Sequence, residues 1–254
     1  MLDVKDVTRR YGALTAVNQV SFSVSPGEVL GYLGPNGSGK STTVKMIVGL
    51  MPTTFGQIFY DGADIQDYLE DYKALVGYVP EEAHVYTYLT GPEYLRLTGR
   101  LRGLSASVLE DKIERFLKLF NLEADYHTTL SSYSKGMRQK ILVSAALLHN
   151  PRVLVLDEPV SGLDVSTALV LRTVVRTLAA DQRIVFYSSH ELETVERIST
   201  RVIILSDGRL VADDSVVHLR ELMNLPSLEA VFGQLAVTED LDSMANALIE
   251  ATQL

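Results

Sequence analysis

The chain contains no cysteine among its 254 residues, which excludes a disulfide framework and thiol chemistry and fits a reducing compartment. It has no apolar run near the roughly 20 residues of a membrane-spanning helix. Its first residues show no signal-peptide pattern. We therefore expect a protein that is soluble when made, and any membrane role would come through a partner.

Positive charge is also scarce, because 23 lysines and arginines face 32 acidic residues and leave a net charge of −9. This balance argues against broad binding to nucleic acid or anionic lipid. The 46% of apolar residues is ample for a packed core and excludes a disordered chain. The length suits one α/β domain, or such a core with an embedded subdomain.

What the sequence does contain is a glycine-rich loop between a predicted strand (29–33) and a predicted helix (42–50). The pattern G-x-x-x-x-G-K-[ST] is met in full, with Lys40 and Ser41 as its last two residues. Loop N–H groups and a helix N-terminus can surround a phosphate, while the lysine reaches the β- and γ-phosphates and the serine holds Mg²⁺. We therefore predict a nucleoside triphosphate site. Its loop residues are Gly34, Pro35, Asn36, Gly37, Ser38, Gly39, Lys40, Ser41 and Thr42.

The segments around this loop have strand patterns. Residues 1–7 suggest a first strand, and alternation of apolar residues with serine over 20–25 predicts a half-buried strand of an antiparallel layer. Asp207-Gly208 predicts a hairpin. Tyr11 allows two interpretations: a strand-end aromatic at the core edge, or a ring on which adenine stacks. The nearby nucleotide site favours stacking.

Between about residues 82 and 150 the pattern becomes helical. Thr90 with Glu93, and Ser107 with Glu110, predict two helix N-termini with capping boxes. The insertion is too long for a simple crossover, so we expect a helical subdomain within an ATPase domain of residues 1–225. Residues 226–254 are expected to form an accessory, helical tail. One apolar helix face is predicted from Ile113, Phe116, Leu117 and Phe120.

Two further predicted strands end in polar residues, where ligands bind in α/β proteins. The first ends in Asp157-Glu158 and the second in Ser188-Ser189-His190. Adjacent side chains of a strand point to opposite sides, so we expect Asp157 to hold Mg²⁺ and Glu158 to activate the attacking water. His190 would donate to the γ-phosphate. The alternatives are an acidic helix cap and a surface histidine. Asp164 is expected to cap the next helix.

In this order the motifs resemble those of ATP-binding cassette (ABC) ATPases, the nucleotide-binding subunits of ABC transporters. Gly34–Thr42 match the Walker A loop, Val153–Glu158 the Walker B strand and Ser161–Asp164 the D-loop. His190 matches the switch histidine, and Tyr11 lies where the family has its adenine-stacking aromatic. The resemblance covers nearly the whole chain.

This resemblance implies an α/β fold: a P-loop NTPase (RecA-like) core sheet with an antiparallel β layer and the inserted helical subdomain. It implies ATP and Mg²⁺ as ligands and ATP hydrolysis as the activity. It also implies a second ABC subunit, in a homodimer or a heterodimer, and a membrane-spanning permease that keeps the chain at the cytoplasmic face of the membrane. No nucleic-acid partner is implied. ATP binding would close the dimer and hydrolysis would open it.

Two positions depart from the family pattern. The usual signature Leu-Ser-Gly-Gly-Gln is here Tyr-Ser-Lys-Gly-Met, which keeps Ser134 and Gly136 for the γ-phosphate held by the other subunit and adds Lys135. Glu81 replaces a usual glutamine, and we expect it near the bound metal. With the segment 228–232, these departures resemble the exporter branch that has a separate permease.

Two other functions were considered. A soluble ABC ATPase of DNA repair, translation or cluster assembly is one alternative, but no long coiled-coil insertion and no second cassette are present. A binding-only pseudo-ATPase is disfavoured because Lys40, Asp157, Glu158 and His190 are all in place.

Overall fold

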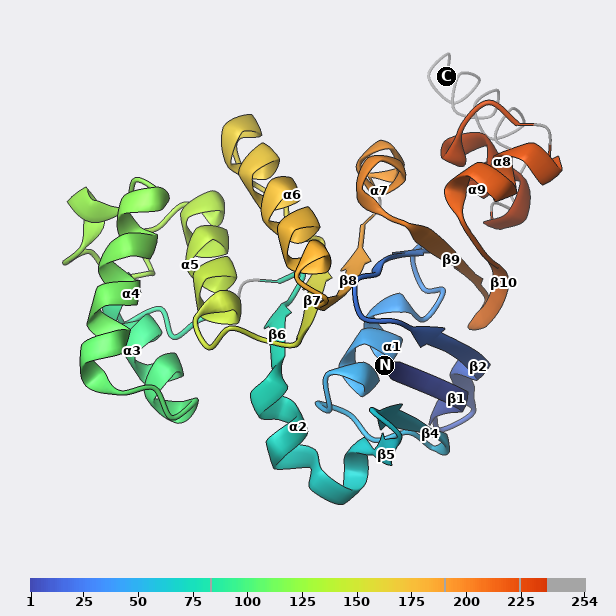
Figure 1. Cartoon of the computed structure of the whole chain (residues 1–254), viewed down its shortest axis with the longest axis horizontal. Helices are drawn as coiled ribbons and strands as arrows, with labels where there is room; N and C mark the ends of the chain where they lie inside the picture. The colour runs from blue at the N-terminus through green and yellow to red at the C-terminus, as the bar shows by residue number, and fades with distance from the viewer. Residues whose placement is uncertain (83, 190, 224, 237–254) are drawn as a thin grey trace, which may run out of the picture.

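The computed structural model describes residues 1–82, 84–189, 191–223 and 225–236. The structure contains two β-sheets and a helical arm (Figure 1). No helix in these ranges is both long and apolar enough to cross a membrane. The part of the 226–254 tail beyond residue 236 lies outside the described residues.

The elements follow one another along the chain in the order below. The strands are β1 (Leu2–Tyr11), β2 (Leu14–Val24), β3 (Val29–Leu33), β4 (Phe55–Tyr60), β5 (Ala63–Asp64), β6 (Val76–Val79), β7 (Val153–Asp157), β8 (Ile184–Ser188), β9 (Arg201–Ser206) and β10 (Arg209–Asp214). The α-helices are α1 (Lys40–Ile47), α2 (Leu69–Leu75), α3 (Gly91–Leu101), α4 (Ala106–Leu119), α5 (Lys135–Leu147), α6 (Val165–Ala180), α7 (Leu192–Ile198), α8 (Val216–Met223) and α9 (Leu228–Ala236). Short 3₁₀ helices span Ile65–Tyr68 and Glu123–Asp125.

The larger sheet has the strand order β10-β9-β3-β8-β7-β6 and is parallel except for β10. Strands β3, β7 and β8 are buried throughout and mainly apolar, because helices or the second sheet cover both faces. In register, Tyr32 lies opposite Ser188, and Asp157 lies opposite the same serine from β7. The carboxyl ends of β3, β8 and β7 therefore meet at one edge.

The smaller sheet is antiparallel, with the order β2-β1-β4-β5. The predicted alternation in β2 is confirmed, since Val20, Phe22 and Val24 are buried and the serines between them are exposed. Strand β1 is longer than expected and continues to Tyr11. A core between the two sheets includes the aromatic rings of Phe22, Tyr32 and Phe186, whose centroids lie 4.7 to 6.3 Å apart.

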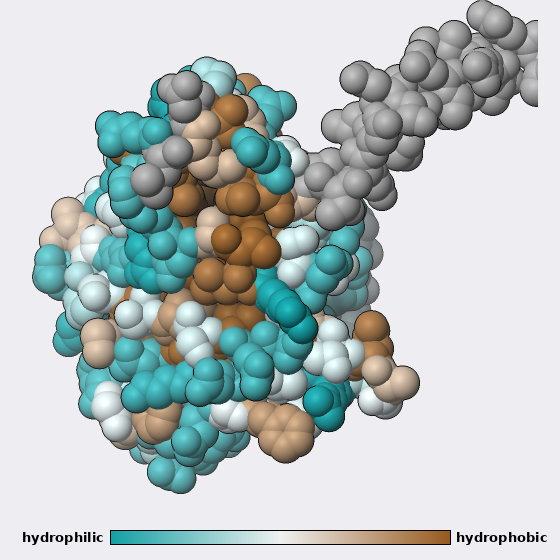
Figure 2. Space-filling view, turned by 90° about the vertical axis from the view of Figure 1, so that its right-hand side faces the viewer, coloured by the Kyte–Doolittle hydropathy of each residue, from teal (hydrophilic) through white to brown (hydrophobic). Residues whose placement is uncertain are grey.

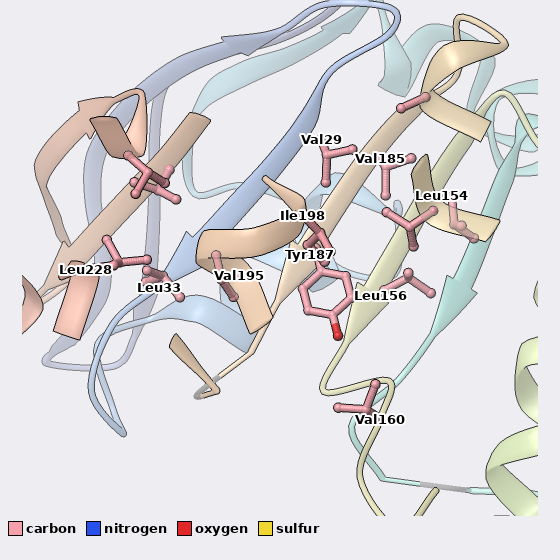
Figure 3. Close-up of a cluster of buried hydrophobic side chains, with 14 of the residues drawn as sticks. Val29, Leu33, Leu154, Leu156, Val160, Val185, Tyr187, Val195, Ile198 and Leu228 are labelled. Carbon is pink, nitrogen blue, oxygen red and sulfur yellow. The ribbon is translucent and has the colours of Figure 1, made fainter. Parts of the chain in front are cut away.

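A second core lies on the opposite face of the large sheet. Side chains of β3, β7 and β8 point to this side, where α6 and α7 cover them (Figure 3). Helix α9 joins this core through Leu228 and Val231, which are fully buried. Figure 2 looks at the side of the molecule with α8, α9 and β10, where a band of apolar side chains interrupts a hydrophilic surface. Exposed apolar residues of these elements include Val211 and Val217.

Helices α3, α4 and α5 form an arm that projects to one side of the sheet (Figure 1) and has a core of its own. The capping box at the start of α3 is confirmed, since Thr90 and Glu93 bond each other's backbone N–H. The capping box predicted at Ser107 and Glu110 is wrong. Helix α4 begins one residue before Ser107, and both carboxylate oxygens of Glu110 instead accept hydrogen bonds from Arg96.

Candidate active site

The loop between β3 and α1 has a backbone that only glycine allows at two points. Gly39 has φ of +100°, and a Cβ there would lie 2.4 Å from the Ala16 carbonyl oxygen. A Cβ on Gly34 would lie 2.3 Å from Ser38 Oγ. Gly37 has a φ of +81° but free space around it. The loop is therefore held close to its neighbours, and its shape depends on the missing side chains.

Helix α1 begins without a side-chain cap, because its N-cap residue is Gly39. Its first backbone N–H groups consequently have no partner within the helix or from a capping side chain. Ser38 Oγ is buried and has no hydrogen-bond partner among the described residues. Such a cluster of unused donors with the positive end of a helix dipole suits a phosphate.

The start of α1 and part of the loop before it border a cavity of about 320 Å³. The cavity is lined by Ala16, Asn36, Gly37, Gly39, Lys40, Ser41, Thr42, Glu81, Asp157 and Glu158. One wall is thus the phosphate loop and the start of α1, and the other wall carries three carboxylates. A triphosphate with a divalent cation matches this division, since the cation offsets repulsion between its phosphates and the acidic wall.

Lys40 folds back over its own loop, where its Nζ donates to the carbonyl oxygens of Gly34 at 2.6 Å and Pro35 at 3.0 Å. Burial lowers the pKa of Lys40, whereas the nearby charges of Glu158, Asp157 and Glu81 act in the opposite direction. These three carboxylates favour the ammonium form. Lys40 is accordingly a partly buried cation between the loop and the acidic wall.

Asp157 and Glu158 both line the cavity, which corrects the expectation that they point to opposite sides. The alternation of a strand ends at Asp157, and Glu158 has a left-handed backbone with φ of +48°. Its N–H donates to the Ser188 carbonyl oxygen at 2.9 Å, and Ser189 Oγ donates to Glu158 Oε2 at 3.1 Å. A positive φ is unusual for glutamate, and neighbouring bonds keep it in place.

The carboxyl group of Asp157 is influenced by its burial and by its acidic neighbours. Burial, assisted by the charges of Glu81 and Glu158, raises the pKa of Asp157 to about 6. Among the described residues no three His, Cys, Asp or Glu side chains are placed to hold a metal by themselves. A Mg²⁺ ion bound through Ser41, Asp157 and Glu81 would therefore take its remaining ligands from phosphate oxygens and water.

Several predicted residues are outside the lining of this cavity, including Gly34, Pro35 and Ser38 of the loop itself. Tyr11 does not line the cavity. The Arg9 guanidinium lies 5.0 Å from the centroid of the Tyr11 ring, and the Tyr11 hydroxyl donates to Met51 Sδ. Ser134 and Gly136 are at the start of α5, and Asp164 caps α6 by accepting from the Thr167 N–H at 2.8 Å. His190 lies outside the described residues.

Two contributions were missed by sequence reasoning. Ala16 lines the cavity and its carbonyl packs against Gly39, but alanine carries no chemical signal. Gln139 is buried, and its Nε2 donates to the carbonyl oxygen of Pro159 at 3.0 Å; Pro159 directly follows Glu158. The available signal was its position four residues after Lys135, which places both residues on the same face of a helix.

Comparison with known proteins agrees with this geometry. Residues 17–161 match the family described as ABC transporter. The ABC transporter ATP-binding protein NatA of Bacillus subtilis is 32% identical, over 91% of this chain and 96% of its own length. The linearmycin resistance ATP-binding protein LnrL of the same organism is 35% identical, over 84% and 68%. A solved structure titled as the ATP binding subunit of an ABC transporter superposes with a TM-score of 0.86 at 34% identity, covering 92% and 99%.

Proposed function

The chain belongs to the ABC transporter family as an ATP-binding, ATP-hydrolysing subunit, and from this premise we propose that it drives export through a separate permease. Its fold is that of the P-loop NTPase cassettes. The similarity of this chain to a linearmycin resistance ATP-binding protein supports the proposed export, because removal of a toxic compound from the cell would give resistance.

The observation that carries the catalytic assignment is the single cavity that joins the phosphate loop to Asp157 and Glu158. The loop N–H groups and Lys40 bind the phosphates of ATP. Ser41 and Asp157, with Glu81 beside them, would hold Mg²⁺, which supplies charge neutralisation at the phosphates. Glu158 accepts the proton of the attacking water or orients it. Tyr11 is proposed to stack on adenine and His190 to donate to the γ-phosphate.

A second ABC subunit completes the site in this proposal. Ser134 is exposed and Gly136 is partly exposed at the start of α5, outside the cavity lining, and both are proposed to contact a nucleotide held by another chain. Asp164, the N-cap of α6, lies 3.2 Å from Lys140 of the same helix α5 and is proposed to contribute to this site. Whether the second subunit is identical or different, ATP binding would close the pair and hydrolysis would open it.

The permease is proposed to bind near Glu81 and the helical arm, where the exposed Tyr86 and Tyr88 lie. The chain would then act at the cytoplasmic face of the membrane as a peripheral subunit. In this arrangement residues 1–225 form the ATPase domain, with the helical subdomain of about 82–150 inserted in it. Residues 226–254 are an accessory segment.

Replacement of the proposed base tests the catalytic part. Glu158→Gln should retain ATP binding but lose about 10²–10⁴-fold in turnover, because general base catalysis contributes on this order. It should also accumulate an ATP-bound dimer, which size-exclusion chromatography would detect. Glu114→Gln, an exposed change on α4, is the control. Hydrolysis by Glu158→Gln at the wild-type rate would refute the assignment. Transport in vesicles with the co-expressed permease would test direction.

A further inference from the structure

The first two turns of α5 make a set of contacts with residues 159–164, the segment that directly follows Glu158. Lys135 Nζ donates to Ser161 Oγ at 2.6 Å. Gln139 Nε2 donates to the Pro159 carbonyl oxygen, and Lys140 Nζ lies 3.2 Å from Asp164 Oδ2. With Gly136, these residues occupy one face of the helix, since i, i+1, i+4 and i+5 lie together.

The two backbones approach each other closely within this contact. A Cβ on Gly136 would lie 2.3 Å from the Gly162 carbonyl oxygen. A Cβ on Gly162 would lie 3.1 Å from Cγ of Lys135, so the aliphatic stem of the lysine covers this glycine. The two segments are therefore closely packed, and the side chain of Lys135 covers the contact on one side.

The segment 159–164 is connected to Glu158 by a tight turn. The N–H of Ser161 donates to the Glu158 carbonyl oxygen at 3.2 Å, and the N–H of Leu163 donates to that of Val160 at 3.0 Å. Glu158 itself has the left-handed backbone described above, which persists only where neighbouring contacts enforce it. Ser188 and Ser189 brace it from β8, and the α5 contacts brace the turn on its other side.

We propose that Lys135, through its bond to Ser161, is a positioning residue that links the orientation of the helical arm to that of the catalytic Glu158. The inference rests on the proposed function and adds a role within one subunit to the signature segment. In this chain the lysine occupies the place of the first signature glycine, and its ammonium group is directed to the turn after Glu158. Lys135, Ser161 and Glu158 line one common cavity beside the nucleotide site.

Three variants separate this role from direct contact with nucleotide. Lys135→Met keeps the stem and removes the donor, Ser161→Ala removes the acceptor, and Lys135→Arg keeps a donor. Because one hydrogen bond is involved, Lys135→Met and Ser161→Ala should each lower kcat for ATP by about two- to tenfold, with KM within twofold of wild type. The double variant should lose no more than either single one, and Lys135→Arg should recover most of the activity.

Hydrogen exchange on the full-length protein gives a readout that does not need hydrolysis. Amides of residues 159–164 should exchange about two- to tenfold faster in Lys135→Met and in Ser161→Ala than in wild type. Lys118→Met, an exposed lysine of the same arm on α4, should leave this segment unchanged.

Two results would overturn the proposal. One is unchanged exchange at 159–164 in Lys135→Met. The other is a raised KM for ATP in Lys135→Met alone, with Ser161→Ala like wild type, which would make Lys135 a nucleotide contact. Absence of ATPase activity in the wild-type protein with its permease would refute the proposed function instead, and the exchange experiment would still decide the positioning role.

Discussion

Helices α1 and α5 each follow a glycine-containing motif, the phosphate loop at α1 and the signature segment at α5. Their N-termini differ in which groups contact the first backbone N–H groups. Helix α1 has Gly39 as N-cap with no side-chain bond, and its first turn opens into the cavity. Helix α5 is capped, because Ser134 Oγ accepts from the Met137 N–H at 3.2 Å, and its next residues pack on the segment 159–164. An anion therefore finds free donors at α1 but must compete with an internal acceptor at α5.

The difference arises from what each glycine faces. At α1 glycine lets the loop close around an open space, with φ values that L-residues rarely adopt. At α5 Gly136 has ordinary helical geometry and is small because the Gly162 carbonyl lies against it. The same residue type thus builds a cradle in one place and a backbone contact in the other, which sequence patterns do not distinguish.

We expect the largest effect on stability from a side chain added to the phosphate loop before α1. Gly39→Ala combines a strained positive φ with a contact of 2.4 Å to the Ala16 carbonyl oxygen, so we expect a loss of more than about 3 kcal/mol in unfolding free energy and loss of ATP binding. Gly37→Ala has similar strain but free space, and should cost about 1 kcal/mol. Denaturant unfolding of both variants measures the contrast. Equal losses would contradict it.

The second prediction concerns the acidic wall that faces α1. Because the folded pKa of Asp157 is about 6, above its ordinary value, ionisation of this side chain costs stability in full above pH 6, and the cost disappears below about pH 4. Asp157→Asn should therefore stabilise the metal-free protein at pH 8 by about 2 kcal/mol, or roughly 5 °C in Tm.

The gain from Asp157→Asn should shrink as the pH falls toward 4.5. Thermal unfolding at the two pH values, in the presence of chelator, makes the measurement. Excess Mg²⁺ and ATP should reverse the order, because the carboxylate then has a cation to bind. A variant that is less stable than wild type at pH 8 in chelator would show that Asp157 has a supporting role in the fold.

The smallest expected effect concerns the capped N-terminus of α5. Ser134→Ala removes the α5 cap and should cost about 1 kcal/mol, measured by urea unfolding. Ser38→Ala in the phosphate loop removes an oxygen that has no protein partner in the described ranges, and should change stability little. If both serines behaved alike, the contrast between a capped and an open helix end would not hold.

Sequence patterns predicted those features that depend on neighbouring residues. The alternation in β2, the Asp207-Gly208 turn and the Thr90 cap each follow from residues a few positions apart, and the structure has all three. The same short-range reasoning was wrong at Ser107, because the pattern serine-x-x-glutamate also occurs inside α4, where Arg96 of α3 takes the carboxylate. The sequence pattern alone does not tell a capping position from a position inside a helix, and here the contact of Glu110 with α3 determines its role.

The site was predictable in its chemistry and less so in its geometry. The loop pattern identified Lys40 and Ser41, which line the cavity, since their spacing is itself the signal. The left-handed backbone of Glu158 was not predictable, because glutamate rarely adopts it and the contacts that enforce it come from β8 and the following turn. Lys135 was noted as a cation, whereas its partner Ser161 is set by tertiary packing.

The place of β3 in the large sheet has a consequence for how the molecule assembles as it is synthesised. Val29 pairs with Val185 and Leu30 with Arg201, so the phosphate-loop strand has no sheet neighbour until most of the chain has left the ribosome. The helical arm, whose contacts are local, can fold during that interval. Because β3 comes together with Asp157 and Glu158 only late, we expect nucleotide to stabilise the nearly complete chain and not the earlier intermediates.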